Sequence, residues 1–288
     1  MAVFTLSDRL AERRPLIMGI LNVTPDSFSD GGRYRDIDVA LRHAMTMIDE
    51  GADIIDVGGE STRPGSEPVV AEEQLARVMP VILKLVQTRR SLPNRHFLIS
   101  IDTSLSRVAE QAVQAGADII NDVSAGTDDD DMYAVAARLG APIVLMHRQG
   151  TSKTMQDRPA YVDVVAEVKD YLRARADAAM LAGIDAGRIV VDPGIGFGKS
   201  RSHNLALLGR LDDIVELGYP VLLGCSRKRF MGSLCQEENP ADLLGATVAT
   251  TVMGMMAGVS IVRVHDVRPN RQAVQVAHAI EACASSID

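Results

Sequence analysis

The chain has no tryptophan, only three cysteines and no long apolar run, although 47% of its 288 residues are hydrophobic. A membrane span needs roughly 18 or more consecutive apolar residues, and no run approaches that length. The first residues, MAVFTLSDRLAERR, also lack the apolar core of a signal peptide. The cysteines form neither a Cys-x-x-Cys pair nor a metal-ligand spacing, so we expect a reducing, cytoplasmic environment.

An excess of positive charge is missing as well. The net charge of −8 argues against a general surface for nucleic acid or for an anionic membrane. Any anion site must therefore be built from local Arg, Lys and backbone N–H groups. No linker and no shift in composition divides the chain, so we expect a single domain over residues 1–288, with its core at about 16–284.

Eight short apolar runs are present instead, and nearly all of them end on a polar residue. They are Leu16–Leu21, Ile54–Val57, Phe97–Ile101, Ile119–Ile120, Ile143–Met146, Ile189–Val191, Val221–Gly224 and Ile261–Val262. Helical patterns lie between or after them at 37–50, 72–86, 104–115, 132–139, 161–181, 204–217, 240–256 and 269–284. Strands that alternate with helices predict parallel βαβ units. An open, doubly wound sheet fits less well, because no Gly-x-Gly-x-x-Gly follows the first strand.

We therefore predict an α/β fold, a single (β/α)8 TIM barrel whose active site lies at the carboxyl ends of the strands. Three strand-to-helix loops exceed the few residues that are usual in compact α/β proteins. They are Asn22–Asp36, Gly58–Val70 and His147–Ala160, after the first, second and fifth strands. Long loops on one face of a barrel often act as lids or clamps.

Polar side chains at three strand ends give the clearest chemical signal. Asp102, Asn121 and Asp192 each follow a run of aliphatic residues. Buried acids need partners, and two carboxylates with an amide can accept the N–H donors of an aminopyrimidinone ring. One Asp in such a place is more simply a helix N-cap, but three on neighbouring strand ends favour a ligand site.

Basic residues gather after the last two strands. Lys228 lies in GCSRKRFMG, and Arg263 and His265 lie two apart in RVHDV. The ends of strands seven and eight commonly form a phosphate site in barrels, so Arg263 and His265 predict a clamp for a diphosphate. The segment DPGIGFGKS lacks the P-loop spacing, and its Phe197 is suited either to stack on a flat ring or to pack beneath the loop.

The first two long loops carry weaker signals. Asn22 in NVTPDSFSDGG offers a neutral oxygen that suits Mg²⁺, although the segment also reads as a plain turn. Thr62 and Arg63 lie in GGESTRPG, and Arg suits the bidentate recognition of a carboxylate. A surface Arg, however, is normally only solvated.

With these motifs the chain resembles the dihydropteroate synthase family, from about Leu16 to the last helix. The motifs, in order, are NVTPDSFSDGG, GGESTRPG, SIDTS, NDVSAG, LMHRQGTSKTMQ, DPGIGFGKS, GCSRKRFMG and RVHDV. Two positions depart from the common pattern: Arg148, where the family often has Met, and Ile195, where it often has Phe or Leu. Neither departure removes a residue assigned to chemistry, but Arg148 falls in the long fifth loop and is able to alter it.

The resemblance implies a transferase that condenses (7,8-dihydropterin-6-yl)methyl diphosphate with 4-aminobenzoate to give 7,8-dihydropteroate and diphosphate. It also implies Mg²⁺ at Asn22, a homodimer, and sulfonamides as competitive inhibitors. Pterin binding falls on Asp102, Asn121, Asp192 and Lys228, diphosphate contacts on Asn22, Arg63, Arg263 and His265, and aminobenzoate contacts on Thr62, Pro64, Phe197 and Ser226. We expect catalysis, by dissociative substitution at the pterin CH2, to depend on Lys228, Arg263, His265 and Asp102.

Two alternatives stay open. Another pterin- or folate-binding barrel transferase, such as a folate-dependent methyltransferase, shares the acids but has no need for Arg63, Lys228 and the Arg263–His265 clamp. A non-catalytic paralogue binds the pterin only. No Ser–His or Cys–His pairing is visible that would argue for a covalent enzyme intermediate.

Overall fold

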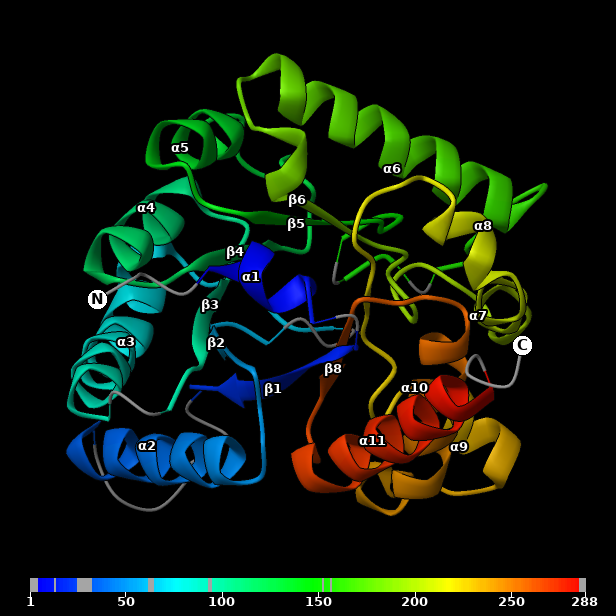
Figure 1. Cartoon of the computed structure of the whole chain (residues 1–288). Helices are drawn as coiled ribbons and strands as arrows, with labels where there is room; N and C mark the ends of the chain where they lie inside the picture. Colours follow the sequence, from blue (N-terminus) through cyan, green and yellow to red (C-terminus); the bar gives the residue numbers. More distant parts are fainter. Residues whose placement is uncertain are drawn as a thin grey trace.

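The computed structural model of the protein describes residues 5–12, 14–24, 33–61, 65–92, 95–151, 153–155 and 157–284, with the backbone alone at 33–36. Its centre is a ring of short strands, surrounded by helices (Figure 1). The strands are β1 (Leu16–Asn22), β2 (Ile54–Gly58), β3 (Leu98–Asp102), β4 (Ile119–Asp122), β5 (Ile143–Met146), β6 (Ile189–Asp192), β7 (Leu222–Leu223) and β8 (Ile261–Val264).

The strands form one parallel sheet that closes on itself. Their order is β6-β5-β4-β3-β2-β1-β8-β7, and all of these pairings are parallel. A further parallel bridge between Val191 and Val221 joins β6 to the residue before β7, so that the ring closes. The predicted (β/α)8 barrel is therefore confirmed.

All the helices but the first follow a strand in sequence and lie around the strands in space, whereas the first precedes β1 and lies over the middle of the ring (Figure 1). They are α1 (Leu6–Leu10), α2 (Arg33–Asp49), α3 (Ala71–Ser91), α4 (Ser106–Ala115), α5 (Met132–Leu139), α6 (Val164–Leu181), α7 (Arg201–Gly209), α8 (Leu211–Val215), α9 (Arg229–Cys235), α10 (Leu244–Met256) and α11 (Val267–Ala284), with 3-10 turns η2 (Ala186–Arg188) and η3 (Pro240–Asp242). Within the described ranges, none of them combines the length and the apolarity of a membrane-spanning helix.

The helices differ from the prediction at three places. The helix expected over 204–217 is divided into α7 and α8 at Arg210, whose φ of −134° and ψ of 40° leave the helical region. Helix α1, and helix α9 directly after Lys228, were not predicted from the sequence. Other ends are as expected: Gly116 and Gly140 end α4 and α5 with φ of 113° and 63°, values that a residue with a side chain rarely adopts.

The barrel interior changes from apolar to polar along the strands. Because successive residues of a strand point to opposite faces, residues two apart share the interior. One interior layer is apolar and consists of Leu16, Met18, Ile54, Leu98, Ile119, Val144, Val190, Leu222 and Ile261, with Leu6 of α1 packed against it. Two residues after members of that layer, towards the carboxyl ends, come Asp56, Ser100, Asn121, Asp192 and Arg263. The strand period thus delivers a polar layer to one end of the barrel.

Arginines surround Asp53, which directly precedes β2 and is 3% exposed. Arg14 binds its two carboxylate oxygens at 2.9 Å each, and Arg9 and Arg271 lie 3.2 Å from it. The Ile17 N–H also donates to Asp53 at 2.9 Å. Burial alone raises the pKa of Asp53, but these hydrogen bonds and positive charges outweigh it, so the pKa lies below its ordinary value.

We predict that Asp53→Asn lowers the free energy of unfolding at pH 7 by about 1.5–3 kcal/mol, the usual contribution of a hydrogen bond to a charged group. Because the folded pKa is depressed, this stabilisation is present at neutral pH and is lost as the pH falls through the folded pKa, below 3.8. Urea unfolding at several pH values measures it. The exposed Asp170→Asn is the control and should change stability by less than about 0.5 kcal/mol. A difference between wild type and Asp53→Asn that persists at the acid end would contradict this account.

Candidate active site

Arg263 connects the acids of the polar layer. Its Nε donates to Asp56 at 2.6 Å, and its Nη2 donates to Asp102 at 2.7 Å. Asn121 Nδ2 donates to the same oxygen of Asp56 at 3.1 Å. Residues from β2, β3, β4 and β8 therefore form one hydrogen-bonded cluster inside the carboxyl end of the barrel.

Asp56 is a member of this cluster that the sequence did not assign. It is fully buried, and its Oδ1 has no hydrogen-bond partner within the described parts of the chain. A buried acceptor without a donor is costly, so the cluster is suited to take up a donor from a ligand. The available signal was a single acid between aliphatic neighbours in Ile54–Val57, which the alternation of the strand turns inward.

Burial perturbs both of the predicted strand-end acids. It raises the pKa of Asp102 to about 7, against the opposing charge of Arg263. Burial also raises the pKa of Asp192, against the Gly194 N–H and the charge of Lys228. The capping alternative fails for Asp102, because α4 begins four residues later with Leu105 as its N-cap. Perturbed acids at barrel strand ends are typical of a functional site.

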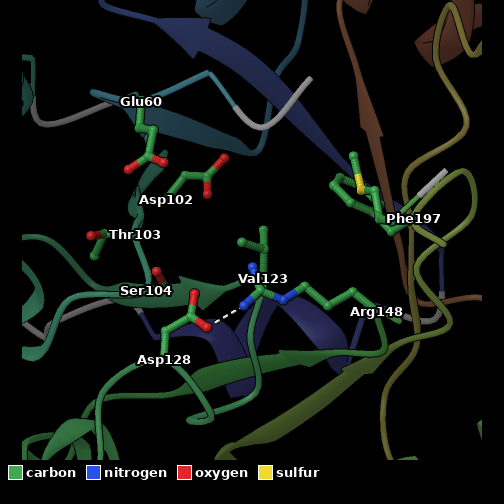
Figure 2. Close-up of a pocket in the computed structure, with 9 residues that line it drawn as sticks. Glu60, Asp102, Thr103, Ser104, Val123, Asp128, Arg148 and Phe197 are labelled. Atoms are coloured by element: carbon green, nitrogen blue, oxygen red, sulfur yellow. Dashed lines mark hydrogen bonds and ion pairs between the residues drawn. The ribbon is translucent and has the colours of Figure 1, made fainter. Parts of the chain in front are cut away.

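Lys228 and Phe197 lie next to Asp192. The Lys228 Nζ is 4.1 Å from the centre of the Phe197 ring, and burial lowers the pKa of Lys228 to about 8, with Asp192 opposing the shift. The Phe197 ring forms part of the wall of a recess (Figure 2), so it does not simply pack beneath its loop. Burial raises the pKa of the neighbouring Cys225 thiol to about 12, in keeping with a core thiol.

His265 and Arg263 engage different partners. The His265 Nδ1 lies 2.9 Å from Ser226 Oγ, and the His265 N–H donates to the same oxygen at 3.2 Å. Arg227 holds Asp266 with hydrogen bonds of 2.7 and 3.1 Å. The loop after β7 is thereby tied to the end of β8, which brings Ser226 and His265 together, whereas the guanidinium of Arg263 is engaged with Asp56 and Asp102.

The recess beside the acids lies between the loops that follow β2, β3, β4, β5 and β6. Its lining is Glu60, Asp102, Thr103, Ser104, Val123, Asp128, Arg148, Met155 and Phe197. Figure 2 shows Arg148 reaching across to Asp128, with which it forms an ion pair. Arg148 therefore joins the loop after β5 to the loop after β4. Ile195, the other departure from the family pattern, is 1% exposed and lies in the core.

Part of the predicted site falls outside the described residues. Thr62, Arg63 and Pro64 are among these, together with most of the loop after β1. Asn22 is described at the end of β1, and its Oδ1 lies 3.6 Å from the position that a Cβ on Gly58 would take. The Asp102 Oδ2 lies at the same distance from that point. Glycine at position 58 thus leaves room between the amide oxygen and the carboxylate.

Comparisons with known proteins identify a matching family and similar sequences and structures. Residues 18–265 match the sequence model of a protein family described as "Pterin binding enzyme". A dihydropteroate synthase of Synechocystis sp. is 44% identical over 268 residues, which cover 93% of this chain and 91% of the relative.

Two solved structures are similar as well. A Xanthomonas albilineans dihydropteroate synthase with 4-aminobenzoic acid has a TM-score of 0.87 and 44% identity, covering 96% of this chain and 97% of that one. A Yersinia pestis dihydropteroate synthase with a sulfonamide drug complex has a TM-score of 0.86 and 40% identity, covering 95% and 96%. Both similarities extend over nearly the whole barrel.

Proposed function

Because the chain belongs to the dihydropteroate synthase family of pterin-binding enzymes, we propose that it condenses (7,8-dihydropterin-6-yl)methyl diphosphate with 4-aminobenzoate. It is a transferase, and its products are 7,8-dihydropteroate and diphosphate. The observation that carries this function is the buried cluster in which Arg263 bridges Asp56 and Asp102, beside Asp192 and Lys228.

The acids and the amide hold the pterin. Asp102, Asn121 and Asp192 accept the N–H donors of the ring, and Lys228 donates to its acceptors. The proximity of Lys228 to Asp192 supports this arrangement. Hydrogen bonds between charged groups and the ring contribute about 1.5–3 kcal/mol each.

The substitution itself is dissociative. The C–O bond to diphosphate breaks with its electron pair on the leaving oxygen, and the positive charge on the CH2 group spreads into the electron-rich ring. The carboxylate of Asp102 stabilises that charge, and Arg263 favours the ionised form of Asp102. The amino nitrogen of 4-aminobenzoate then forms the new C–N bond and loses a proton, so no protein nucleophile takes part.

The remaining residues of the proposed site bind the diphosphate and the aminobenzoate. Asn22, Arg63, Arg263 and His265 bind the diphosphate, and Thr62, Pro64, Phe197 and Ser226 surround the aminobenzoate. The 2.9 Å contact between His265 and Ser226 supports this division, because it places the two subsites side by side. Sulfonamides, found with the Yersinia pestis relative, compete for the aminobenzoate subsite.

One assay separates this function from its alternatives. Diphosphate release from the pterin substrate is measured with and without 4-aminobenzoate, and release that depends on 4-aminobenzoate is expected. A folate-dependent methyltransferase or a pterin-binding paralogue would release none under either condition.

A divalent metal fits the site only in part. Among the described residues no group of three or more His, Cys, Asp or Glu side chains is arranged around a common metal position, and the Asn22 oxygen is a single neutral ligand. Mg²⁺ usually takes its remaining ligands from substrate phosphates and water. When bound, it would neutralise charge on the departing diphosphate.

We predict that turnover requires Mg²⁺ and that the free protein does not bind it tightly. Calorimetry should detect Mg²⁺ binding to the protein when diphosphate is present and none when it is absent. The Asn22→Ala substitution should weaken the binding that is seen with diphosphate. Full turnover in EDTA, or tight Mg²⁺ binding by the free protein, would contradict the assignment.

We propose a homodimer formed through α10 and α11. These neighbouring helices (Figure 1) expose Met253 and Met256, at 51% and 71%, and Val276 and Ile280, at 62% and 64%. Large exposed apolar side chains on adjacent helices are candidates for an interaction surface. A second copy is the occupant that the family resemblance implies.

We predict that Met256→Glu with Ile280→Glu converts the dimer to a monomer in analytical ultracentrifugation, because two charges would be buried at the interface. Leu181→Glu on α6 is the control, since Leu181 is 90% exposed and lies on another helix. A wild-type protein that sediments as a monomer at micromolar concentration would contradict the proposal.

The three cysteines are all free, which supports a reducing, cytoplasmic location as a further proposal.

A further inference from the structure

A buried lysine closes the loop that carries Phe197. Lys199 is 3% exposed, and its Nζ donates to the carbonyl oxygens of Gly194 and Phe197 at 2.9 and 3.0 Å. The His147 Nδ1 lies 2.8 Å from the same Nζ, and the His147 carbonyl oxygen lies at 3.4 Å. Burial lowers the pKa of Lys199 to about 7, with the charge of Asp192 opposing the shift. A buried amino group is costly unless acceptors surround it, and four acceptor atoms surround this one.

These contacts tie the loop after β6 to the end of β5. His147 follows β5 directly, and its N–H donates to the Asp192 carbonyl oxygen at 2.9 Å. The Gly194 N–H donates to the Asp192 side chain at 2.7 Å. The loop from Asp192 to Lys199 therefore begins and ends against the same segment, with the ammonium of Lys199 in its centre.

The glycines of the loop show how closely the two segments approach. A Cβ on Gly194 would lie 1.8 Å from the His147 carbonyl oxygen, and a Cβ on Gly198 would lie 2.5 Å from the Gln149 carbonyl oxygen. Both glycines also have positive φ, 65° and 64°. The Gly194 carbonyl oxygen also accepts from the Phe197 N–H at 3.1 Å, so removing the Lys199 Nζ would leave the Phe197 carbonyl oxygen facing inward without this donor. That cost favours a different shape of the loop.

The loop conformation determines where Phe197 lies. Its carbonyl oxygen is bound by Lys199 inside the loop, while its ring faces the Lys228 Nζ in the active site. The neighbouring Gly198 is held from outside by the Tyr161 hydroxyl, which donates to its carbonyl oxygen at 2.8 Å. Lys199 thus binds the Phe197 carbonyl oxygen, while the Phe197 N–H donates to the Gly194 carbonyl oxygen within the same loop.

We propose that Lys199 is a positioning residue, whose buried ammonium holds the loop after β6 in the shape that places Phe197 against Lys228. This inference rests on the proposed function, in which Phe197 forms part of the aminobenzoate subsite. Lys199 is not among the residues that line the recess. Its partner His147 is neutral, because burial and the charge of Lys199 lower the pKa of His147 to about 3, so Nδ1 is able to accept.

The test is Lys199→Met, which removes the ammonium and keeps a side chain of similar length. We expect the KM for 4-aminobenzoate to rise roughly 3- to 10-fold, the loss of one aromatic contact, with a smaller change in kcat. Affinity for 6-hydroxymethylpterin, measured by calorimetry, should fall by a smaller factor, because Lys199 has no contact with the cluster around Arg263 and acts on Asp192 through its charge. The matched control is Lys169→Met, a partly exposed lysine of α6 paired with Glu216, which should change neither value.

Chemical rescue of a Lys199 variant and substitution of its partner His147 provide two further tests. In Lys199→Ala, added ethylammonium should lower the KM for 4-aminobenzoate, and ethanol should not. If the Lys199 variants do not fold, His147→Leu removes one acceptor, and it should raise the same KM more than His147→Gln does.

An unchanged KM in folded Lys199→Met, or an equal loss of pterin affinity, would overturn the proposal. Absence of 4-aminobenzoate-dependent diphosphate release in the wild type would instead overturn the proposed function, so the two failures are distinguishable.

Discussion

Arg263→Met is expected to lower the free energy of unfolding by about 3–5 kcal/mol, because removing one partner of a buried ion pair leaves an uncompensated charge. Asp56 is fully buried and Asp102 is 7% exposed, and both rely on this guanidinium. Turnover should fall roughly 100- to 1000-fold, as it does when one preorganised charge-stabilising group is lost. Urea unfolding and steady-state diphosphate release measure the two effects.

A double variant separates the structural part of this effect from the catalytic part. In Arg263→Met with Asp56→Asn, the buried charge of Asp56 is removed together with its partner, so the part of the stability lost through Asp56 should recover. Turnover should not recover, because Asp102 still lacks its cation and the diphosphate lacks a ligand. Full recovery of turnover would mean that Arg263 serves only to neutralise Asp56. Arg263→Lys should rescue little, since a single ammonium cannot reproduce the fork that reaches both acids.

The barrel was predictable because its strands are short aliphatic runs that end on polar residues. The same pattern selected Asp102, Asn121, Asp192 and Arg263, which the structure brings to one end of the barrel. It could not supply their pairing. Arg263 and Asp56 are 207 residues apart in sequence, and only the closed ring of strands makes them neighbours. The local sequence pattern therefore predicted which residues form the polar layer, but not the hydrogen bonds between them.

Local pattern also misplaced some backbone. The sequence around Arg210 has continuous helical spacing, yet the chain leaves the helical region there and starts α8. Lys199 is a similar case, because its glycine-rich segment is like a phosphate loop in composition, whereas tertiary contacts turn the ammonium inward onto carbonyl oxygens. Composition does not report which way a side chain faces when neighbouring loops supply its partners.

Asp192→Ala is expected to weaken the binding of 6-hydroxymethylpterin by about 3–6 kcal/mol, since two charge-assisted hydrogen bonds to the ring would be lost. Asp192→Asn separates charge from loop structure. The Asn oxygen can still accept from the Gly194 N–H, which lies 2.7 Å from the Asp192 carboxylate, so the loop after β6 should keep its shape. Asn should therefore retain more affinity than Ala, although both lose the ionic part.

The pH dependence gives Asp192 a second signature. Its negative charge opposes the burial that lowers the pKa of Lys228 to about 8. Without that charge the pKa of Lys228 falls further, so Lys228 loses its proton at lower pH and the alkaline limb of pterin binding moves towards neutrality. Calorimetric titrations from pH 6 to 9 on wild type, Asp192→Asn and Asp192→Ala measure the shift, with Asp163→Asn at the exposed N-cap of α6 as the control. If both the affinity for 6-hydroxymethylpterin and the alkaline limb were unchanged, Asp192 would not bind the pterin ring.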